Sequence, residues 1–256
     1  MDCVKKRECQ EERLEITRDS LFAGALCCQQ YREGYRFSID AVLLAHYSLS
    51  VCSQGKVLDL CCGSGIVGLI MAYRSAQLSV TGVELQNKLA DLARVNSLEN
   101  GMANRFEVIQ GDLRCINQFL APESMQVVVC NPPYGKMETG RLSRLAEAAI
   151  ARHEMQADMQ DCVRAASFAV QNRGRVVFVY PAVRLPSLLI ELSHHRLITK
   201  KIQPIYSYPD SSEAKLVLVE SMKNGGDHCV LLPPLYIYQY KKGPYSQEVL
   251  NMYDPS

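Results

Sequence analysis

Residues 57–68 read V-L-D-L-C-C-G-S-G-I-V-G, and this stretch decides the fold. The apolar run Lys56–Leu60 predicts a strand, and Ile66–Tyr73 predicts a helix. Between them, Gly63-Ser64-Gly65-Ile66-Val67-Gly68 matches the pattern G-x-G-x-x-G. Glycines are needed there because the backbone must turn tightly and let a ligand approach the helix N-terminus. The stretch therefore predicts a strand–turn–helix unit with a ligand-binding turn.

Further short apolar runs alternate with helical patterns along the chain, which predicts β-α-β units and a mostly parallel sheet. Val127–Cys130 is apolar throughout, as expected of a strand covered on both faces. The expected fold is a doubly wound α/β domain with helices on both faces of the sheet. The strand candidates are Lys56–Leu60, Leu78–Val83, Phe106–Gln110, Val127–Cys130, Arg175–Tyr180 (entered through the turn Asn172-Arg173-Gly174), Ile198–Tyr206, Lys215–Glu220 and Tyr236–Tyr240.

Composition excludes several classes of protein. The 256 residues are 48% hydrophobic and 21% charged, with a net charge of +1. This is ordinary globular composition, which excludes intrinsic disorder and coiled coil. The net charge is too small to indicate by itself that the protein binds nucleic acid. No apolar run approaches the roughly 20 residues of a membrane span, and the N-terminus is too charged for a secretory signal. We expect a cytoplasmic protein that is a monomer or weak dimer and has no membrane partner.

The eleven cysteines do not form a recognisable metal-binding pattern. Their spacing includes the adjacent pairs Cys27–Cys28 and Cys61–Cys62 but no C-x-x-C motif. We therefore expect reduced thiols that are mostly buried as small hydrophobic side chains, and no bound metal.

Two carboxylates at strand ends indicate the kind of ligand. Glu84 ends the second strand, 21 residues after Gly63, where a carboxylate accepts hydrogen bonds from the two hydroxyls of a ribose. A solvated acid at a helix N-terminus is the alternative interpretation. Asp59 lies four residues before Gly63, where it repels phosphate and suits a cationic ligand. The sequence predicts a cofactor that carries a nucleoside and a positive charge.

This first turn resembles the first motif of class I S-adenosylmethionine-dependent methyltransferases. The resemblance implies a Rossmann-like fold with a seven-stranded sheet, and it implies that Asp59 faces the methionine part of the cofactor. It also implies that Asp112, in Gly111-Asp112-Leu113, holds the adenine amino group, although a helix N-cap is an alternative role for Asp112. The residues expected to bind the cofactor are Phe37, Asp40, Asp59, Gly63, Gly65, Glu84, Leu85, Asp112, Leu113 and Asn131.

The fourth strand runs into Asn131-Pro132-Pro133-Tyr134, which suits methyl transfer to a planar amino group. The lone pair of such a nitrogen is delocalised, so it is a poor nucleophile. The Asn131 side-chain oxygen and the Pro132 carbonyl can accept its two hydrogens and favour the geometry of attack. Tyr134 offers a ring on which a flat acceptor can stack. Asn131, Pro132 and Tyr134 are the predicted catalytic residues, and the motif resembles the methyltransferases that act on adenine, guanine or glutamine amides.

The flanking segments narrow this resemblance. Residues 34–45, Ala151-Arg152-His153-Glu154 and Tyr245–Val249 look like the bacterial family that methylates adenine 37 of valine tRNA at its 6-amino group. The resemblance covers about residues 19–254 and implies that Phe37 and Asp40 line the cofactor site. An amphipathic helix start capped by Ser38 or Asp40 is the alternative, and a charged helix face explains Arg152, His153 and Glu154. The expected organisation is an N-terminal extension near the cofactor site (1–50), a methyltransferase domain (51–240) and a C-terminal tail (241–256).

Charge favours an RNA acceptor. The segment 131–201 holds eleven basic and six acidic residues, a local charge of +5 that the near-neutral total hides. A phosphate backbone binds such a rim through counterion release. Pro133, Lys136, Arg141 and Arg144 are the candidate RNA contacts, and an anticodon-loop base is the easier target because it is unpaired.

Two other acceptors remain open at this point: a glutamine of a release factor, methylated at N5, and an adenine or guanine amino group of ribosomal RNA. The glutamine enzymes resemble this fold preceded by a helical domain, and residues 1–55 lack a multi-helix hydrophobic pattern. A binding protein without activity and an NAD-dependent reductase are disfavoured by the intact Asn-Pro-Pro-Tyr motif and by Asp59. The pair Cys61–Cys62 departs from the commonest first turn, where a small residue and a glycine are usual.

Overall fold

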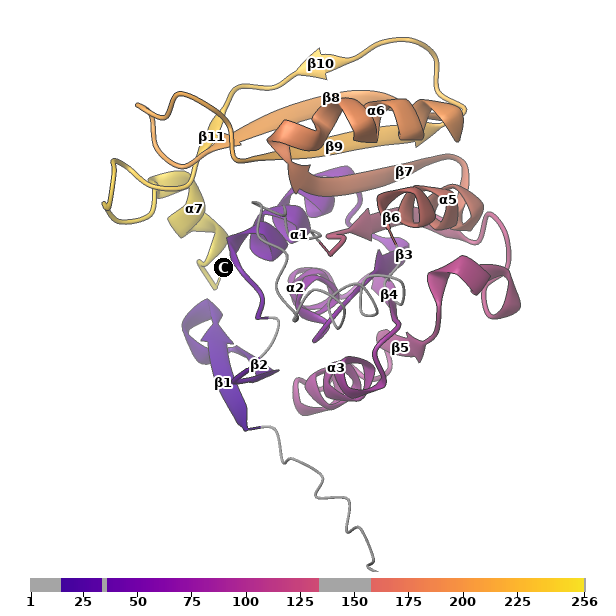
Figure 1. Cartoon of the computed structure of the whole chain (residues 1–256). Helices are drawn as coiled ribbons and strands as arrows, with labels where there is room; N and C mark the ends of the chain where they lie inside the picture. The colour runs from indigo at the N-terminus through magenta and orange to yellow at the C-terminus, as the bar shows by residue number, and fades with distance from the viewer. Residues whose placement is uncertain (1–14, 34–35, 134–157, 256) are drawn as a thin grey trace, which may run out of the picture.

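A nine-stranded mixed sheet forms the centre of the computed structural model, which describes residues 15–33, 36–133 and 158–255 (Figure 1). The strand order is β10-β8-β9-β7-β6-β3-β4-β5, and β11 pairs with β8 beside that path. The long strands are β3 (Gly55–Leu60), β4 (Leu78–Glu84), β5 (Phe106–Gln110), β6 (Met125–Cys130), β7 (Val170–Pro181), β8 (Leu197–Tyr206) and β9 (Leu216–Lys223). These correspond to seven of the eight predicted strands, and β10 (Val230–Leu231) and β11 (Leu235–Tyr236) add two residues each.

Strands β3 to β7 run parallel, and β9 lies antiparallel between β7 and β8. The chain goes outward from β3 to β4 and β5 on one side, and then returns to β6 and β7 on the other. The strand order therefore reverses between β3 and β6. In open α/β sheets, ligands bind outside the carboxyl ends of the strands at such a switch point.

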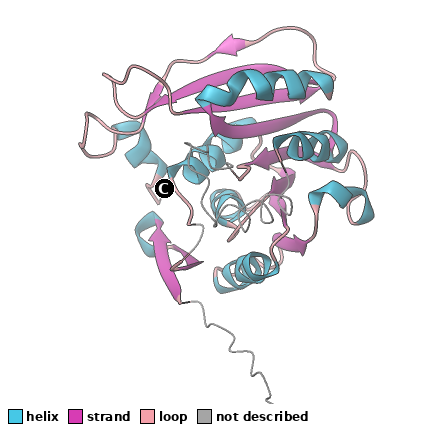
Figure 2. Cartoon of the chain, in the orientation of Figure 1, coloured by secondary structure: helices cyan, strands magenta, loops and turns pink. Residues whose placement is uncertain are grey.

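Helices cover both faces of the sheet, as predicted (Figure 2). One face carries α1 (Ile39–Val51), α2 (Ile66–Arg74) and α3 (Asn87–Glu99), and the other carries α5 (Met159–Ala169) and α6 (Leu185–His194). Successive side chains of a strand point to opposite faces, so Val57 joins the first core and Leu58 the second. The same alternation later decides which strand residues reach the site.

An N-terminal hairpin, β1 (Ile16–Leu21) and β2 (Leu26–Tyr31), was not predicted. Its strand β2 faces the domain and packs on α3 through side-chain amides: Asn96 accepts from Gln29 N (2.7 Å), and Asn100 accepts from Cys27 N (2.9 Å). The hairpin is thus held by asparagines of a helix instead of a neighbouring strand. A hydrophobic-pattern search cannot detect contacts of this kind.

The second half of the chain differs from the sequence prediction at three places. Strand β7 begins at Val170, so the predicted turn lies within it; the strand absorbs that turn through a register shift opposite Met125 and through Arg173, whose φ is +62°. The predicted strand Tyr236–Tyr240 is reduced to β11. The tail forms α7 (Gln247–Met252), which buries Val249 completely. In the described part of the chain, every helix is too short or too polar to cross a membrane.

Candidate active site

The candidate site lies at the carboxyl ends of β4, β3 and β6. In the sheet register, Leu60 of β3 pairs with Val83 of β4 on one side and with Cys130 of β6 on the other. Glu84 and Asn131 therefore both stand one residue beyond the end of β3 and flank the turn that begins there. The residue predicted to bind ribose and the residue predicted to bind the reacting amine lie on the two sides of one turn.

A cavity of about 750 Å³, open to solvent, lies at this edge. Its walls come from the ends of all four central parallel strands. The lining residues are Cys61, Gly63, Val83, Glu84, Leu85, Gln86, Leu89, Gly111, Asp112, Leu113, Asn131 and Pro133.

Glu84 is held in place by backbone amides. Its Oε2 accepts from Gly63 N (2.9 Å) and its Oε1 accepts from Gln86 N (2.8 Å). Burial raises the pKa of this carboxyl, while the amide hydrogen bonds act in the opposite direction. Each oxygen retains a second lone pair, so the fixed carboxylate can still accept hydrogen bonds from a ligand.

Asp112 lines the cavity and also caps a helix, so the structure shows the helix-cap role, while its contact with the cofactor's adenine amino group stays a prediction. It accepts from Arg114 N (2.9 Å) at the start of the 3-10 helix η2 (Leu113–Gln118). The Arg114 guanidinium contacts both carboxylate oxygens and holds the pKa of Asp112 below its usual value. Between Asp112 and Glu84 the wall is apolar, from Leu85, Leu89 and Leu113. A flat heterocycle with polar ends suits such a wall.

Asp59 lies deeper than the sequence prediction placed it. It pairs with Gly82 of β4, two residues before Glu84, and its side chain points to the α2 face, where it accepts from Gly68 N (3.1 Å). It is not among the described residues that line the cavity. Burial is the largest cause that raises its pKa, to about 8, so the carboxyl is mostly protonated at neutral pH. Asp59 thus acts first as a cap of α2, and its contact with a cofactor stays a prediction.

The two glycines of the turn have different roles. Gly63 lines the cavity and donates its N–H to Glu84. Gly65 lies behind the lining with φ of +85°, and a Cβ at this position would stand 2.9 Å from the ring of Phe106. Its role in the structure is therefore close packing of α2 against the sheet.

Phe37 and Asp40 lie outside the lining of the cavity as well. Phe37 N donates to Gln30 Oε1 (2.7 Å) of the hairpin. Asp40 is buried at the start of α1, where Ser38 and the Ala41 amide (3.1 Å) donate to it. The structure shows the helix-start role for Asp40, and the predicted cofactor contacts of both residues stay predictions.

The residues after β6 are described only in part. Asn131 and Pro133 line the cavity, and Pro132 between them is buried. Residues 134–157 lie outside the described residues. This segment contains the predicted site residues Tyr134, Lys136, Arg141, Arg144, Arg152, His153 and Glu154.

Sequence reasoning missed five lining residues: Cys61, Val83, Gln86, Leu89 and Gly111. Four of them are direct neighbours or one helical turn from predicted residues, so a search of each strand-end loop as a whole would have found them. No sequence pattern indicated that Cys61 lines the cavity, because it stands at a position of the turn where a small residue is usual.

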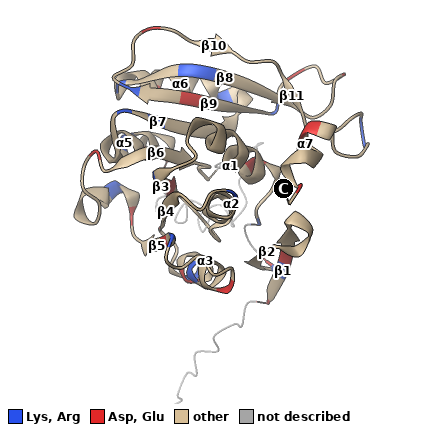
Figure 3. Cartoon of the chain, turned by 180° about the vertical axis from the view of Figure 1, so that it is seen from behind, with Lys and Arg blue, Asp and Glu red and all other residues tan. Residues whose placement is uncertain are grey.

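Described basic residues of segment 131–201 are spread over the molecule. Arg164 pairs with Asp161 on α5, and Arg175 and Lys201 pair with the buried Glu220. In Figure 3, a basic stretch of β8, drawn in blue, lies beside an acidic stretch of β9, drawn in red. Arg184, directly after β7, lies at the carboxyl edge of the sheet that carries the cavity.

Comparison with known proteins agrees with this geometry. The model of the family "methyltransferase small domain" matches residues 39–177, which is more than half of the chain. A relative from Shewanella putrefaciens, "tRNA1(Val) (adenine(37)-N6)-methyltransferase", is 30% identical over 165 residues, covering 64% of this chain and 68% of the relative.

Solved structures show the same fold at lower identity. A predicted O-methyltransferase from Agrobacterium tumefaciens has a TM-score of 0.67 at 22% identity, covering 83% of this chain and 94% of that one. Geranyl diphosphate C-methyltransferase from Streptomyces coelicolor, solved with S-adenosyl-L-homocysteine, has a TM-score of 0.52 at 14% identity, covering 70% and 76%. The chain belongs to the methyltransferase small domain family.

Proposed function

We propose that this protein transfers a methyl group from S-adenosylmethionine to the 6-amino group of an adenine in tRNA. The observation that carries the proposal is the placement of Glu84 and Asn131 on either side of the turn after β3, at one cavity. The Shewanella relative, which is named for this reaction at adenine 37 of a valine tRNA, supports the choice of acceptor.

The cavity residues fit the cofactor. Its apolar wall suits the adenine ring, and the carboxylates of Glu84 and Asp112 stand where hydroxyl and amino groups need acceptors. S-adenosylmethionine supplies a methyl group on a sulfonium, which is ready for transfer without further activation. Glu84, fixed by two backbone amides, would accept from the ribose hydroxyls without having to reorganise.

Asn131 and Pro132 would prepare the acceptor. The Asn131 side-chain oxygen accepts one hydrogen of the adenine amino group, and the Pro132 carbonyl accepts the other. Holding both hydrogens aligns the nitrogen lone pair with the methyl group. The nitrogen gives up one proton after the transfer, so no ionised base is required.

The acceptor reaches the cavity from the carboxyl edge, where Pro133 is exposed and Arg184 lies nearby. Lys136, Arg141 and Arg144 follow the motif in the sequence and are proposed to bind the phosphate backbone of the anticodon arm. Such a substrate places the protein in the cytoplasm.

Transfer of labelled methyl groups to separated cell fractions tests the acceptor class. The purified chain is incubated with methyl-labelled S-adenosylmethionine and either bulk tRNA, ribosomal RNA or a protein extract. We expect label in the tRNA fraction that nuclease releases and protease does not. Label in a release factor or in ribosomal RNA would overturn the proposed acceptor and keep the methyltransferase assignment.

A further inference from the structure

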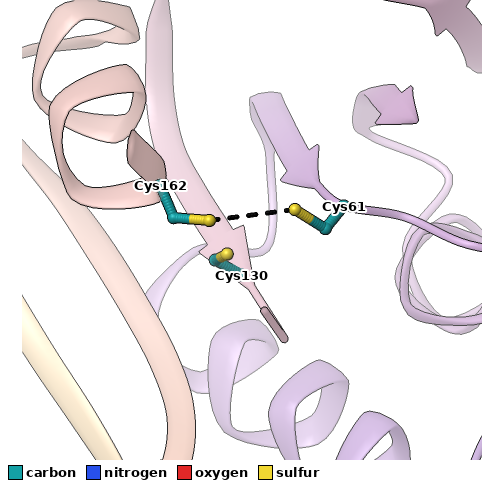
Figure 4. A group of neighbouring side chains, drawn as sticks. All are labelled: Cys61, Cys130 and Cys162. Atoms are coloured by element: carbon teal, nitrogen blue, oxygen red, sulfur yellow. Dashed lines mark hydrogen bonds between the residues drawn. The ribbon is translucent and has the colours of Figure 1, made fainter. Parts of the chain in front are cut away.

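Three cysteines from different parts of the chain meet behind the cavity (Figure 4). Cys61 follows β3, Cys130 ends β6, and Cys162 lies on α5. Their Sγ atoms all lie within 4.8 Å of one another, and the Cys61 and Cys162 sulfurs are 3.8 Å apart. It is the one group of three metal-ligating side chains found in the described part of the chain.

The fold brings these thiols together by the register of the sheet. Cys130 pairs with Leu60, so Cys61 stands next to it at the strand ends. Both Val128 and Cys130 point to the α5 face, where Cys162 is completely buried. Cys61 has a φ of +58°, a left-handed conformation that is uncommon for a residue other than glycine. This backbone conformation puts the thiol of Cys61 on the same side as the other two.

The dimensions suit one thiophilic metal ion. A Zn²⁺ ion with Zn–S bonds of about 2.3 Å in tetrahedral geometry holds its sulfurs about 3.8 Å apart. The Cys61–Cys162 separation already has this value. Thiolate sulfur is a soft ligand that prefers Zn²⁺ and Cu⁺ to Mg²⁺ or Ca²⁺. Because each ligand comes from a different segment, no C-x-x-C motif announces the site.

We propose that Cys61, Cys130 and Cys162 form a three-thiolate Zn²⁺ site, with the fourth position on the side where Cys61 lines the cavity. The inference goes beyond the proposed function and does not depend on it. Each cysteine binds the metal as a thiolate, so every sulfur that is protonated beforehand gives its proton to solvent. The ion would tie α5 to the ends of β3 and β6, directly beside Asn131.

Titration of the reduced, metal-free full chain with Zn²⁺ against a chromophoric chelator tests the site. We expect one tightly bound ion per chain, with release of protons from the thiols as it binds. Cys61→Ala, Cys130→Ala and Cys162→Ala should each lower the affinity at least 100-fold. Cys115→Ala and Cys229→Ala are matched controls, because these exposed thiols lie outside the cluster, and they should bind Zn²⁺ as the unchanged chain does.

Cys61→Ala is the variant that should disturb folding least, because Cys61 is only partly buried. X-ray absorption of the Zn²⁺-loaded, unsubstituted chain counts the sulfur ligands without any variant, and three are expected. Fewer than three sulfurs, or equal Zn²⁺ affinity in the unchanged chain and in Cys61→Ala, would overturn the proposal.

Discussion

Strands β3 and β4 are neighbours in the sheet, and each carries a buried acid near its carboxyl end, Asp59 and Glu84, yet the two acids differ in surroundings. Asp59 is 1% exposed and Glu84 is 6% exposed. Asp59 pairs with Gly82, so Glu84 stands two residues nearer the carboxyl edge. One carboxyl caps α2 through the Gly68 amide, and the other lines the cavity between two amides.

This difference shows that an acidic residue near the end of a strand does not necessarily line the ligand site. The side chains alternate between faces, and the register with the neighbouring strand decides how far each one reaches. Asn131 stands at the level of Glu84 on the other side of β3, and it lines the cavity too. Depth in the sheet, more than residue type, separates Asp59 from this pair.

The largest expected effect concerns stability and pH. Because burial raises the pKa of Asp59 in the folded state to about 8, the folded state keeps a proton that the unfolded chain loses. The contribution of Asp59 to the free energy of unfolding should therefore be largest below about pH 4 and should fall as pH rises toward 8, by at most about 5 kcal/mol. Asp59→Asn should flatten that fall, measured by urea unfolding between pH 5 and 8. Equal slopes in both proteins would show that Asp59 is charged in the fold.

Asn131→Ala tests the role of the residue that follows β6. Loss of a hydrogen bond to the reacting amine should cut turnover by about 100-fold or more. Cofactor affinity should stay nearly unchanged, because Glu84, Asp112 and the apolar wall that are proposed to hold the cofactor remain. Single-turnover methylation and calorimetry separate the two quantities. Full activity in this variant would remove Asn131 from the chemistry.

Glu84→Gln and Asp59→Asn form a matched pair for cofactor binding, since each replaces a buried carboxyl by an amide. Glu84→Gln should weaken S-adenosylmethionine by about 2 kcal/mol, because charge-assisted hydrogen bonds to the ribose are lost. Asp59→Asn should change the affinity far less, since its side chain is turned toward α2. Calorimetry that gives the reverse order would mean that the cofactor contacts the deeper acid.

The smallest expected effect is on RNA. Arg184 lies at the edge that carries the cavity, while Arg196, directly before β8, lies at the opposite edge. Arg184→Gln should lower tRNA affinity a few-fold and make the salt dependence slightly less steep, since about one phosphate contact is lost. Arg196→Gln should leave both unchanged in filter-binding titrations from roughly 50 to 200 mM salt. Equal effects of the two substitutions would mean that tRNA does not bind at the edge of the sheet that carries the cavity.

Most of the sheet could be predicted from the sequence, because each of the strands β3 to β9 contains apolar residues that are buried. The apolar run is continuous in Val127–Cys130 of β6 and is interrupted by polar residues in β8. Local sequence patterns failed to predict an element where contacts with residues distant in the sequence determine its structure. The hairpin β1–β2 is held by asparagines of α3. The predicted turn before Arg175 lies inside β7 because β6 pairs with β7 on both sides of that turn, at Val170 and again from Arg175 onward.

The candidate site could be predicted as a set of strand-end loops but not in its depth. Glu84 and Asn131 were chosen by type and spacing, and Asp112 and Leu113 were chosen through the family resemblance; the four residues meet at one cavity. Asp59 was chosen by the same reasoning and lies behind the cavity, because spacing along the chain does not give the register between strands. Cys61 escaped notice since its partners Cys130 and Cys162 are distant in sequence.

Nucleoside analysis of methylated tRNA tests the central claim most directly. Unmodified tRNA is incubated with S-adenosylmethionine and either the unchanged chain or Asn131→Ala, and is then digested to nucleosides. The account predicts N6-methyladenosine with the unchanged chain and at least 100-fold slower formation with the variant. Absence of N6-methyladenosine, or its formation at equal rates with both proteins, would contradict it.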